Sequence, residues 1–487
     1  MSLFSKQDNQ EKDSTKKVKK SKGRNHEYVV VMYLFLAIFV GIILYYIYFM
    51  AFQRDTFINN PYNSLQNLFG EHVVRGEITD CDGNVLAKTK VDENGQETRV
   101  YPYENLFAHV VGFSTNGKSG LENVENFELL RSHEFFLEQF ADQMNDEKSQ
   151  GDRVVTTLDL SIQQTAYNAL GSCDGSVYVM EPQTGKILAM VSKPDFNPNT
   201  IEEDWESVSG EESTALFNRA TQGQYAPGSV FKMVTLLEYY REHPLDYMNY
   251  SYQCEGGITV EDQTIHCAGN KAHGQEDLKQ SFANSCNASF SNIGLQLDYQ
   301  KYKALTDSLL FNKDLPIDFI SAQSRFALKE SDNDFMVMST AMGQGKTLVS
   351  PLHMALLASA ISNDGVLMRP YLVDHTENAD GIVVRTQKPS QYGSIMSKEE
   401  ADFLEEYMLE VVNTGTATAL GRDGYDVAGK TGTAQVSDTS DTTNSWFVGY
   451  ATKEDQRTVA IAVVVERNNE NGVSAVNVAK QVLDSCF

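Results

Sequence analysis

The longest apolar run of the chain lies near its N-terminus. Residues 28–53, YVVVMYLFLAIFVGIILYYIYFMAFQ, contain no charged side chain. At about 1.5 Å per residue, a helix of this length crosses a hydrocarbon core of about 30 Å. Residues 1–26 before it carry eight Lys and Arg against three acidic residues. Because basic flanks stay in the cytoplasm, the pattern predicts a single-pass anchor, with residues after Arg54 on the outer side of the cell membrane.

A cleaved signal peptide is the alternative interpretation of this run. Its apolar part is usually about 7 to 15 residues long and ends at a small-residue cleavage site. Here the run is much longer and continues into YFMAFQRD. Its length therefore favours a retained anchor over residues 28–53 that follows a basic cytoplasmic tail over residues 1–27.

Short segments of alternating apolar and polar residues follow the anchor, as expected for strands with one buried face. Two of them flank Asp82-Gly83 in RGEITDCDGNVLAKT, which predicts a β-hairpin. The remainder of this region, up to about Gln150, is rich in loops. We therefore predict a small β-rich N-terminal pedestal domain over residues 54–152.

Residues 153–487 have the pattern of a larger domain. In GSVYVMEPQTGKILAMVS, two β-rich runs are joined by Pro182 to Gly185, which predicts a second hairpin. Helical periodicity dominates from Ser229 to about Ile361, and the C-terminal part returns to strands spaced for an antiparallel meander. Strands, then helices, then strands predict an α+β fold, with helices grouped beside one sheet.

Length and charge restrict the class of protein. A chain of 487 residues holds two or three domains of the usual size. It has 40 Lys and Arg against 66 Asp and Glu, a formal net charge of −26. Because nucleic-acid binding needs basic surface to pair with phosphates, this balance argues against a nucleic-acid partner.

The segment YAPGSVFKMV places Ser229 three positions before Lys232. If a helix begins near Ser229, the two side chains share a helix face, with Cβ atoms about 5 to 6 Å apart. A serine hydroxyl is a weak nucleophile and needs a base that removes its proton during attack. Lysine can be that base when burial and a neighbouring cation lower its pKa. The pair therefore predicts a serine nucleophile activated by lysine.

The Ser-x-x-Lys spacing alone arises by chance, as Ser14 and Lys17 in the basic tail illustrate. Two further motifs strengthen the prediction. NSCNASF contains Ser285 and Asn287, and GKTGTAQ begins a Lys-Thr-Gly motif at Lys430. The order Ser-x-x-Lys, Ser-x-Asn, Lys-Thr-Gly is that of penicillin-binding proteins and serine β-lactamases.

With these motifs, the chain resembles a class B penicillin-binding protein of the short penicillin-binding protein A type over nearly all of residues 54–466. Further segments that carry the resemblance are RGEITDCDGNVLA, TTLDLSIQQTA, EPQTGKILAMVSKPDFNPN, MGQG and SWFVGY. The resemblance implies a β-lactamase/transpeptidase-like domain, with an antiparallel sheet, helices and an all-helical subdomain, on the pedestal. It also implies a peptidoglycan D,D-transpeptidase that β-lactams inhibit. Valine at 230, where threonine is common, is one departure.

The resemblance also implies roles for the motif residues. Ser229 attacks the penultimate D-alanine carbonyl of a stem peptide, with Lys232 as the base. Ser285 relays a proton to the leaving amine, and Asn287 positions Lys232. Lys430 receives the terminal carboxylate of the substrate, together with a substrate-binding set made of Thr431, Gly432 and Thr433. The backbone N–H groups of Ser229 and Thr433 form the oxyanion hole.

Cys254, Cys267 and His273 fall in one short segment just before the Ser-x-Asn motif. Thiolate and imidazole suit tetrahedral zinc, and some members of the family hold zinc in the corresponding segment. A fourth ligand is not evident from the sequence; His266, Cys286 or an acidic residue could supply it. The alternatives are a disulfide between the first two cysteines, since all six lie beyond the anchor, or free thiols. No cofactor is expected for catalysis.

Two other functions use the same serine and lysine. A penicillin-sensing receptor would normally need further membrane spans and a cytoplasmic effector, which a 27-residue tail does not offer. A β-lactamase or D,D-carboxypeptidase would give the acyl group to water, and the pedestal and anchor argue against it. The partners implied by the resemblance are peptidoglycan stem peptides, β-lactam antibiotics, the membrane and a polytopic membrane glycosyltransferase of the shape, elongation, division and sporulation family.

Overall fold

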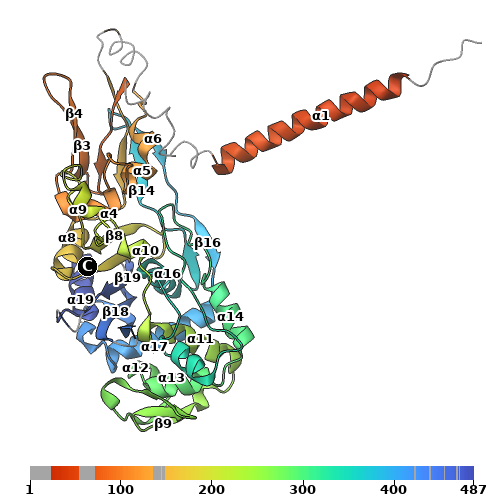
Figure 1. Ribbon diagram of the computed structural model, residues 1–487, viewed down its shortest axis with the longest axis vertical. Helices are drawn as coiled ribbons and strands as arrows, with labels where there is room; N and C mark the ends of the chain where they lie inside the picture. Colours follow the sequence, from red (N-terminus) through yellow and green to blue (C-terminus); the bar gives the residue numbers. More distant parts are fainter. Residues whose placement is uncertain are drawn as a thin grey trace, which may run out of the picture. The chain divides into compact units, whose positions relative to one another are not determined.

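The computed structural model describes residues 24–53, 72–134, 144, 148–421, 424–437, 440–454, 456–467, 470 and 472–487. The protein divides into two compact units, residues 1–60 and residues 61–487 (Figure 1). In the first unit, the apolar run forms helix α1 (Arg24–Tyr48) and a π-helical turn, η1 (Phe49–Gln53). The part Glu27–Tyr48 is long and apolar enough to span a membrane. Most of the predicted basic tail and the first residues of the predicted pedestal lie outside the described residues.

Six short strands form one sheet at the pedestal, in the order β15-β14-β6-β2-β3-β4. The strands are β2 (Ile78–Thr79), β3 (Val85–Val91), β4 (Glu97–Val100), β6 (Arg153–Thr156), β14 (Val373–Glu377) and β15 (Val383–Thr386). β2 and β3 form the predicted hairpin. The Asp80 carboxylate holds its turn by accepting hydrogen bonds from the backbone N–H groups of Asp82 and Asn84. Because β14 and β15 come from far along the chain, the pedestal sheet also contains strands of the predicted larger domain.

Shorter elements complete the pedestal. They are β1 (Val73–Val74), η2 (Glu104–Phe107), α4 (Ala108–Val111), α5 (Gly120–Val124), α6 (Asn126–Leu129) and β5 (Ser149–Gln150). A buried charge cluster fastens α5 to the strands, because Nε of Arg75 and Nε of Arg99 donate to the two carboxylate oxygens of Glu122 at 2.6 and 2.7 Å. Burial alone would raise the pKa of Glu122, but the two guanidinium groups outweigh burial and lower it.

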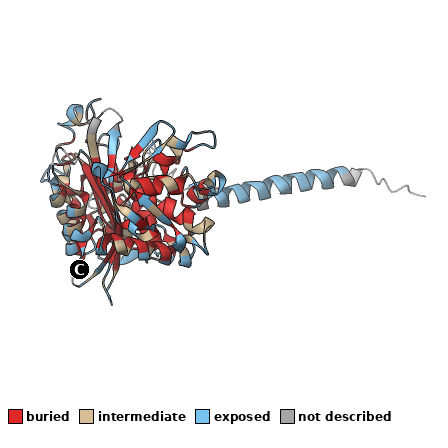
Figure 2. Cartoon of the chain, turned by 90° about the horizontal axis from the view of Figure 1, so that it is seen from below, coloured by how far each residue is buried: buried red, intermediate tan, exposed pale blue. Residues whose placement is uncertain are grey.

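A five-stranded antiparallel sheet forms the centre of the larger domain, in the order β17-β18-β19-β7-β8. Its strands are β7 (Gly175–Met180), β8 (Ile187–Lys193), β17 (Asp426–Ser437), β18 (Ser440–Thr452) and β19 (Thr458–Val465). The predicted hairpin is β7–β8, and the predicted meander is β17–β19. Since β7, β8 and β19 are buried along their whole length, both faces of the sheet are covered (Figure 2). Helices that pack on the sheet are α8 (Leu160–Leu170), α16 (Pro351–Ile361) and α19 (Ala475–Cys486).

Most remaining helices gather beside this sheet (Figure 1). They include α10 (Arg219–Gln222), α11 (Lys232–Glu242), α12 (Leu278–Ala283), α13 (Asn287–Gly294), α14 (Tyr299–Ser308), α15 (Asp334–Ala341) and α17 (Lys398–Asn413). The short helix α9 (Trp205–Val208) lies instead beside α4, where Trp205 contacts Phe113 of the pedestal (Figure 1). The stretch predicted to be helical also contains strand pairs: β9 (Ser251–Cys254) with β12 (Gly274–Asp277), and β10 (Gly257–Val260) with β11 (Gln263–His266). β13 (Val366–Met368) pairs with β16 (Gln391–Ser394). The helical subdomain therefore carries a small β-extension, which consists of β9 to β12.

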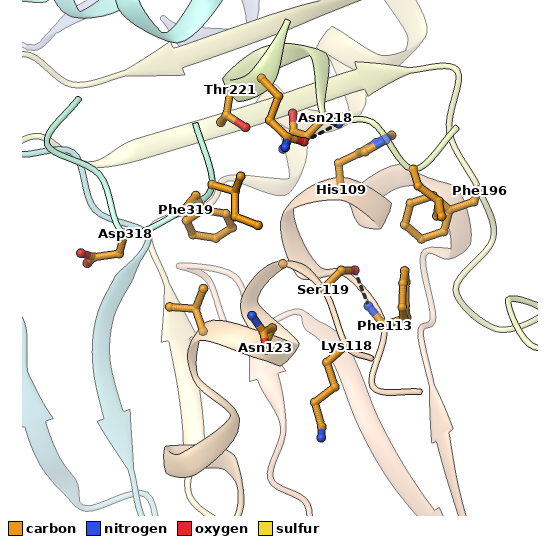
Figure 3. A pocket seen from close by; sticks show the side chains of 15 residues that line it. His109, Phe113, Lys118, Ser119, Asn123, Phe196, Asn218, Thr221, Asp318 and Phe319 are labelled. Carbon is orange, nitrogen blue, oxygen red and sulfur yellow. Dashed lines mark hydrogen bonds between the residues drawn. The ribbon is translucent and has the colours of Figure 1, made fainter. Parts of the chain in front are cut away.

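A cavity of about 320 Å³ lies where the pedestal meets the larger domain (Figure 3). Phe113 and Asn123 line it from the pedestal, and Asn218 and Phe319 line it from the larger domain. His109 also lines the cavity and donates to the Ala215 carbonyl oxygen at 2.8 Å, and burial lowers its pKa to about 4. His109 is therefore a neutral structural histidine. None of the motif residues predicted for catalysis lines this cavity.

Candidate active site

Ser229 lies in a single 3-10 turn, η3 (Gly228–Phe231), which leads directly into α11. The turn is fixed from outside, because Nε1 of Trp446 on β18 donates to the carbonyl oxygen of Ala226 at 3.2 Å. The predicted Ser-x-x-Lys contact is present: Nζ of Lys232 lies 3.0 Å from Oγ of Ser229. The 3-10 turn followed by the α-helix thus brings the amine to hydrogen-bonding distance of the hydroxyl.

The Ser-x-Asn motif lies between α12 and α13 and faces the same amine. Nζ of Lys232 donates to the carbonyl oxygen of Ser285 and to Oδ1 of Asn287, each at 2.7 Å. Ser285 has a φ of 57°, a left-handed conformation that non-glycine residues rarely adopt. Such conformations persist where surrounding contacts enforce them, often at functional sites. One such contact is the hydrogen bond from Nδ2 of Asn287 to the carbonyl oxygen of His266, at 2.9 Å.

The Lys-Thr-Gly motif lies on β17, opposite the serines. Nζ of Lys430 donates to Oγ of Ser285 at 3.0 Å, and Nζ of Lys232 lies 3.3 Å from the same oxygen. Ser285 therefore bridges two amines. A Cβ atom at Gly432 would lie 3.1 Å from the carbonyl oxygen of Pro227, so this glycine allows the backbone before Ser229 to approach β17 closely.

The hydroxyl groups of the Lys-Thr-Gly segment have different surroundings. Oγ1 of Thr431 lies 2.5 Å from Oγ1 of Thr416, whereas Thr433 is exposed. Thr416 was not predicted, because it stands 15 residues before its partner and belongs to no motif. Only the packing of the loop after α17 against β17 reveals it.

Both lysines of the site are fully buried, and neither forms an ion pair with a described carboxylate. Burial lowers the pKa of Lys232 to about 7. Burial, followed by the charge of Lys232, lowers the pKa of Lys430 well below its usual value. Phe290 and Phe282 add apolar surroundings, with ring centroids 5.5 and 5.6 Å from the two ammonium nitrogens. A neutral amine beside a serine hydroxyl at neutral pH is the arrangement that general-base catalysis requires.

The predicted metal ligands lie beside this site, and Cys286 joins them. The donor atoms of Cys254, Cys267, His273 and Cys286 all lie within 4.8 Å of one another. Sγ of Cys254 is 3.7 Å from Sγ of Cys267 and 3.5 Å from Nδ1 of His273, and Sγ of Cys267 is 3.8 Å from Sγ of Cys286. The two cysteines considered for a disulfide are not bonded. The cluster could hold a zinc ion, with Cys286 as the fourth ligand that the sequence left open.

Comparison with known proteins agrees with this geometry. Residues 175–484 match the family described as penicillin binding protein transpeptidase domain, and residues 75–154 match the penicillin binding protein A dimerisation domain. The chain is 32% identical to the peptidoglycan D,D-transpeptidase PbpA of Mycolicibacterium smegmatis over 446 residues, which is 85% of this chain and 88% of that protein.

Solved structures agree as well. The D,D-transpeptidase domain of a peptidoglycan glycosyltransferase from Eggerthella lenta is 32% identical, with a TM-score of 0.74, 85% of this chain covered and 97% of that one. Penicillin-binding protein A from M. tuberculosis, as its penicillin G acyl-enzyme, is 26% identical, with a TM-score of 0.76 and coverage of 85% and 99%.

The fold and the three convergent motifs therefore define a serine acyltransferase of the penicillin-binding class. The chain belongs to the penicillin-binding protein transpeptidase family, with a penicillin-binding protein A dimerisation domain. It is a peptidoglycan D,D-transpeptidase that reacts with β-lactams through an acyl-enzyme. These findings bear out the predicted fold class, family and activity.

Proposed function

We propose that Ser229 is the nucleophile of the transpeptidase and that Lys232 is the base for acylation. The observation that carries the proposal is the 3.0 Å distance between Oγ of Ser229 and Nζ of Lys232, an amine whose burial lowers its pKa to about 7. Near neutral pH, much of this amine is unprotonated and able to take the hydroxyl proton as Oγ attacks the penultimate D-alanine carbonyl. The products are an ester at Ser229 and free terminal D-alanine. An amine of a neighbouring stem peptide then resolves the ester.

The other motif residues receive complementary roles in this proposal. Ser285, hydrogen-bonded to both amines, passes a proton to the leaving nitrogen, and Asn287 orients Lys232. Lys430 attracts the terminal carboxylate of the stem peptide, with hydroxyl groups and space supplied by Thr431, Gly432 and Thr433. A bound carboxylate would favour the charged form of the buried Lys430, because an opposite charge offsets the effect of burial.

Covalent labelling with a fluorescent penicillin tests these roles. We expect Ser229→Ala to abolish labelling and Lys232→Ala to slow it severely, while Ser14→Ala, the chance match of the motif in the tail, labels like the wild type. Retained labelling of Ser229→Ala would refute the assignment. An assay with a stem-peptide donor and an amine acceptor separates transpeptidation from carboxypeptidase activity, because the latter releases D-alanine without forming a cross-link.

We further propose that the cluster Cys254, Cys267, His273 and Cys286 binds a structural zinc ion. At a Zn–S bond length of about 2.3 Å and a Zn–N bond length of about 2.0 Å, the ligand atoms of a tetrahedral site lie about 3.5 to 3.8 Å from one another. The separations of 3.7, 3.5 and 3.8 Å within the cluster support this geometry. Protein ligands would occupy all four coordination positions of the ion. The ion would therefore fasten the β-extension to the Ser-x-Asn motif and supply no catalytic chemistry.

Elemental analysis of protein purified without added metal tests the zinc proposal. We expect about one zinc per chain, a large loss of zinc in Cys254→Ser, and full retention in Cys81→Ser, because Cys81 is exposed and outside the cluster. A zinc content well below one ion per chain in the wild-type protein would contradict the proposal. Mass analysis of the alkylated protein without reduction would then distinguish a disulfide from free thiols.

The remaining assignments concern the membrane and the domains. We infer that residues 1–27 form a cytoplasmic tail, 28–53 a membrane anchor, 54–152 the pedestal and 153–487 the transpeptidase domain. The apolar helix α1 supports the membrane anchor. The family resemblance supports a polytopic glycosyltransferase of the shape, elongation, division and sporulation family as the partner of the enzyme. Full-length protein is expected in the membrane fraction and a chain that starts at Arg54 in the soluble fraction; solubility of the full-length chain without detergent would contradict the anchor. Co-purification with such a glycosyltransferase tests the partner.

A further inference from the structure

The turn that carries Ser229 is enclosed on two sides by backbone without intervening side chains. Gly228, directly before the serine, has a φ of +55°, and its N–H group donates to the carbonyl oxygen of Gly343 at 2.8 Å. A Cβ atom at Gly343 would lie 1.7 Å from the carbonyl oxygen of Gly228, and one at Gly228 would lie 2.6 Å from the carbonyl oxygen of Thr433. The turn after α15, the serine turn and β17 are therefore in direct contact.

Helix α15 is itself fastened to the helices that carry the other motif residues. It packs against α13, which begins at Asn287, and the Thr235 hydroxyl of α11 donates to the carbonyl oxygen of Ala341 at 2.7 Å. Gly343 follows two residues later with a φ of +91°, and its N–H group bonds to Thr340. The end of α15 thus has a fixed position relative to both α11 and α13.

We propose that Gly343 is a positioning residue for acylation. Its carbonyl oxygen accepts a hydrogen bond from the N–H group of Gly228. This hydrogen bond fixes the distance between the turn that carries Ser229 and the backbone of Thr433. The N–H groups of Ser229 and Thr433 must both lie about 2.7 to 3.1 Å from a developing oxyanion, so a small displacement of the turn weakens one donor. Loss of one such donor typically lowers the rate by about 10²- to 10³-fold. This inference rests on the proposed roles of Ser229 and Thr433.

Gly343→Ala, compared with Gly365→Ala, tests the inference. Gly365 also has a positive φ, +81°, and a Cβ atom there would lie 2.2 Å from the carbonyl oxygen of Met396, in a turn after α16 away from the motifs. Both substitutions therefore place a Cβ atom against a backbone carbonyl oxygen at a residue with positive φ. For Gly343→Ala we expect the rate constant of acylation by penicillin to fall about 10²-fold, with the dissociation constant of the prior non-covalent complex within about threefold. For Gly365→Ala we expect both constants within about threefold of the wild type at a comparable fall in melting temperature.

The acyl-enzyme gives a second measurement. Hydrogen bonds from the two N–H groups lower the stretching frequency of the ester carbonyl, so infrared difference spectra should show a higher frequency in Gly343→Ala and an unchanged one in Gly365→Ala. Wild-type acylation by Gly343→Ala, or an equal loss in Gly365→Ala, would overturn the proposal. Penicillin labelling of Ser229→Ala would instead overturn the catalytic assignment, so the two failures are distinguishable.

A milder pair of variants keeps the test decisive if Gly343→Ala does not fold. Thr235→Val removes the hydroxyl that holds the end of α15, together with its hydrogen bond to the Tyr302 hydroxyl of α14, and introduces no backbone collision. Thr306→Val removes another buried hydroxyl, which bonds within α14 to the carbonyl oxygen of Lys303. We expect acylation to slow several-fold in Thr235→Val and to stay at the wild-type rate in Thr306→Val. Equal rates in the two variants would overturn the proposal.

Discussion

At the scale of single residues, the site depends on two amines that are buried without a carboxylate partner among the residues that the structure describes. Lys232 and Lys430 both contact Ser285, and burial lowers the pKa of each. Near neutral pH, Lys232 is thus able to accept a proton, as a base must. The order of the three motifs predicted that these residues belong to one site. It could not predict that Ser285 bridges the two amines, because that position depends on a backbone conformation with φ of 57°.

The pKa of Lys232 makes a prediction about pH. Below about pH 7 this lysine holds a proton and cannot accept another, so the acylation rate constant should fall about tenfold per unit, and above that pH it should level off. Rapid-mixing measurements of penicillin acylation between about pH 5 and pH 8 check this limb. A rate constant that stays flat across this range, in protein that remains folded by circular dichroism, would contradict the role of Lys232.

Cys286 shows a limit of sequence reasoning at the same scale. The sequence offered it only as one of several candidates for a fourth ligand, because nothing in the local spacing distinguishes it from His266 or an acidic residue. The fold brings the β-extension over the start of α13, so Cys254 and Cys267 of the preceding segment lie beside Cys286. A cluster that is assembled by tertiary packing cannot be predicted from sequence spacing.

At the scale of elements, local patterns were sufficient where partners are adjacent in the chain. The β2–β3 and β7–β8 hairpins and the β17–β19 meander follow from turn residues and alternation. The pairing of β14 with β6 joins residues that are more than 200 positions apart, so no local signal indicates it. The four-residue strands β9 to β12 are too short for periodicity to identify.

The buried charge cluster at α5 makes a prediction about stability. Glu122→Gln leaves the guanidinium groups of Arg75 and Arg99 buried without a counter-charge, which should destabilise the fold by about 3 to 5 kcal/mol. The matched control is Glu77→Gln, which breaks a partly exposed pair with Arg153 and should cost about 0 to 1 kcal/mol. Thermal unfolding of the detergent-solubilised full-length protein compares the two. Equal falls in melting temperature in the two variants would show that the buried cluster does not stabilise the pedestal more than the partly exposed pair does.

At the scale of the whole molecule, the fold brings two lysine amines from distant parts of an acidic chain to one place. Against a net charge of −26, Lys232 and Lys430 are brought within reach of one serine by η3, α11 and β17. The family comparisons cover both the pedestal and the larger domain, so the sequence motifs and the fold lead to the same enzyme. The central claim is therefore chemical: this one hydroxyl forms the covalent intermediate.

Mass analysis of the penicillin-treated protein after trypsin digestion tests that claim most directly. Cleavage after Arg219 and Lys232 releases the peptide ATQGQYAPGSVFK, in which Ser229 is the only serine. We predict one penicilloyl group per chain, carried by this peptide and assigned by fragmentation to Ser229. An unmodified peptide together with a penicilloyl group elsewhere in the chain would contradict the account.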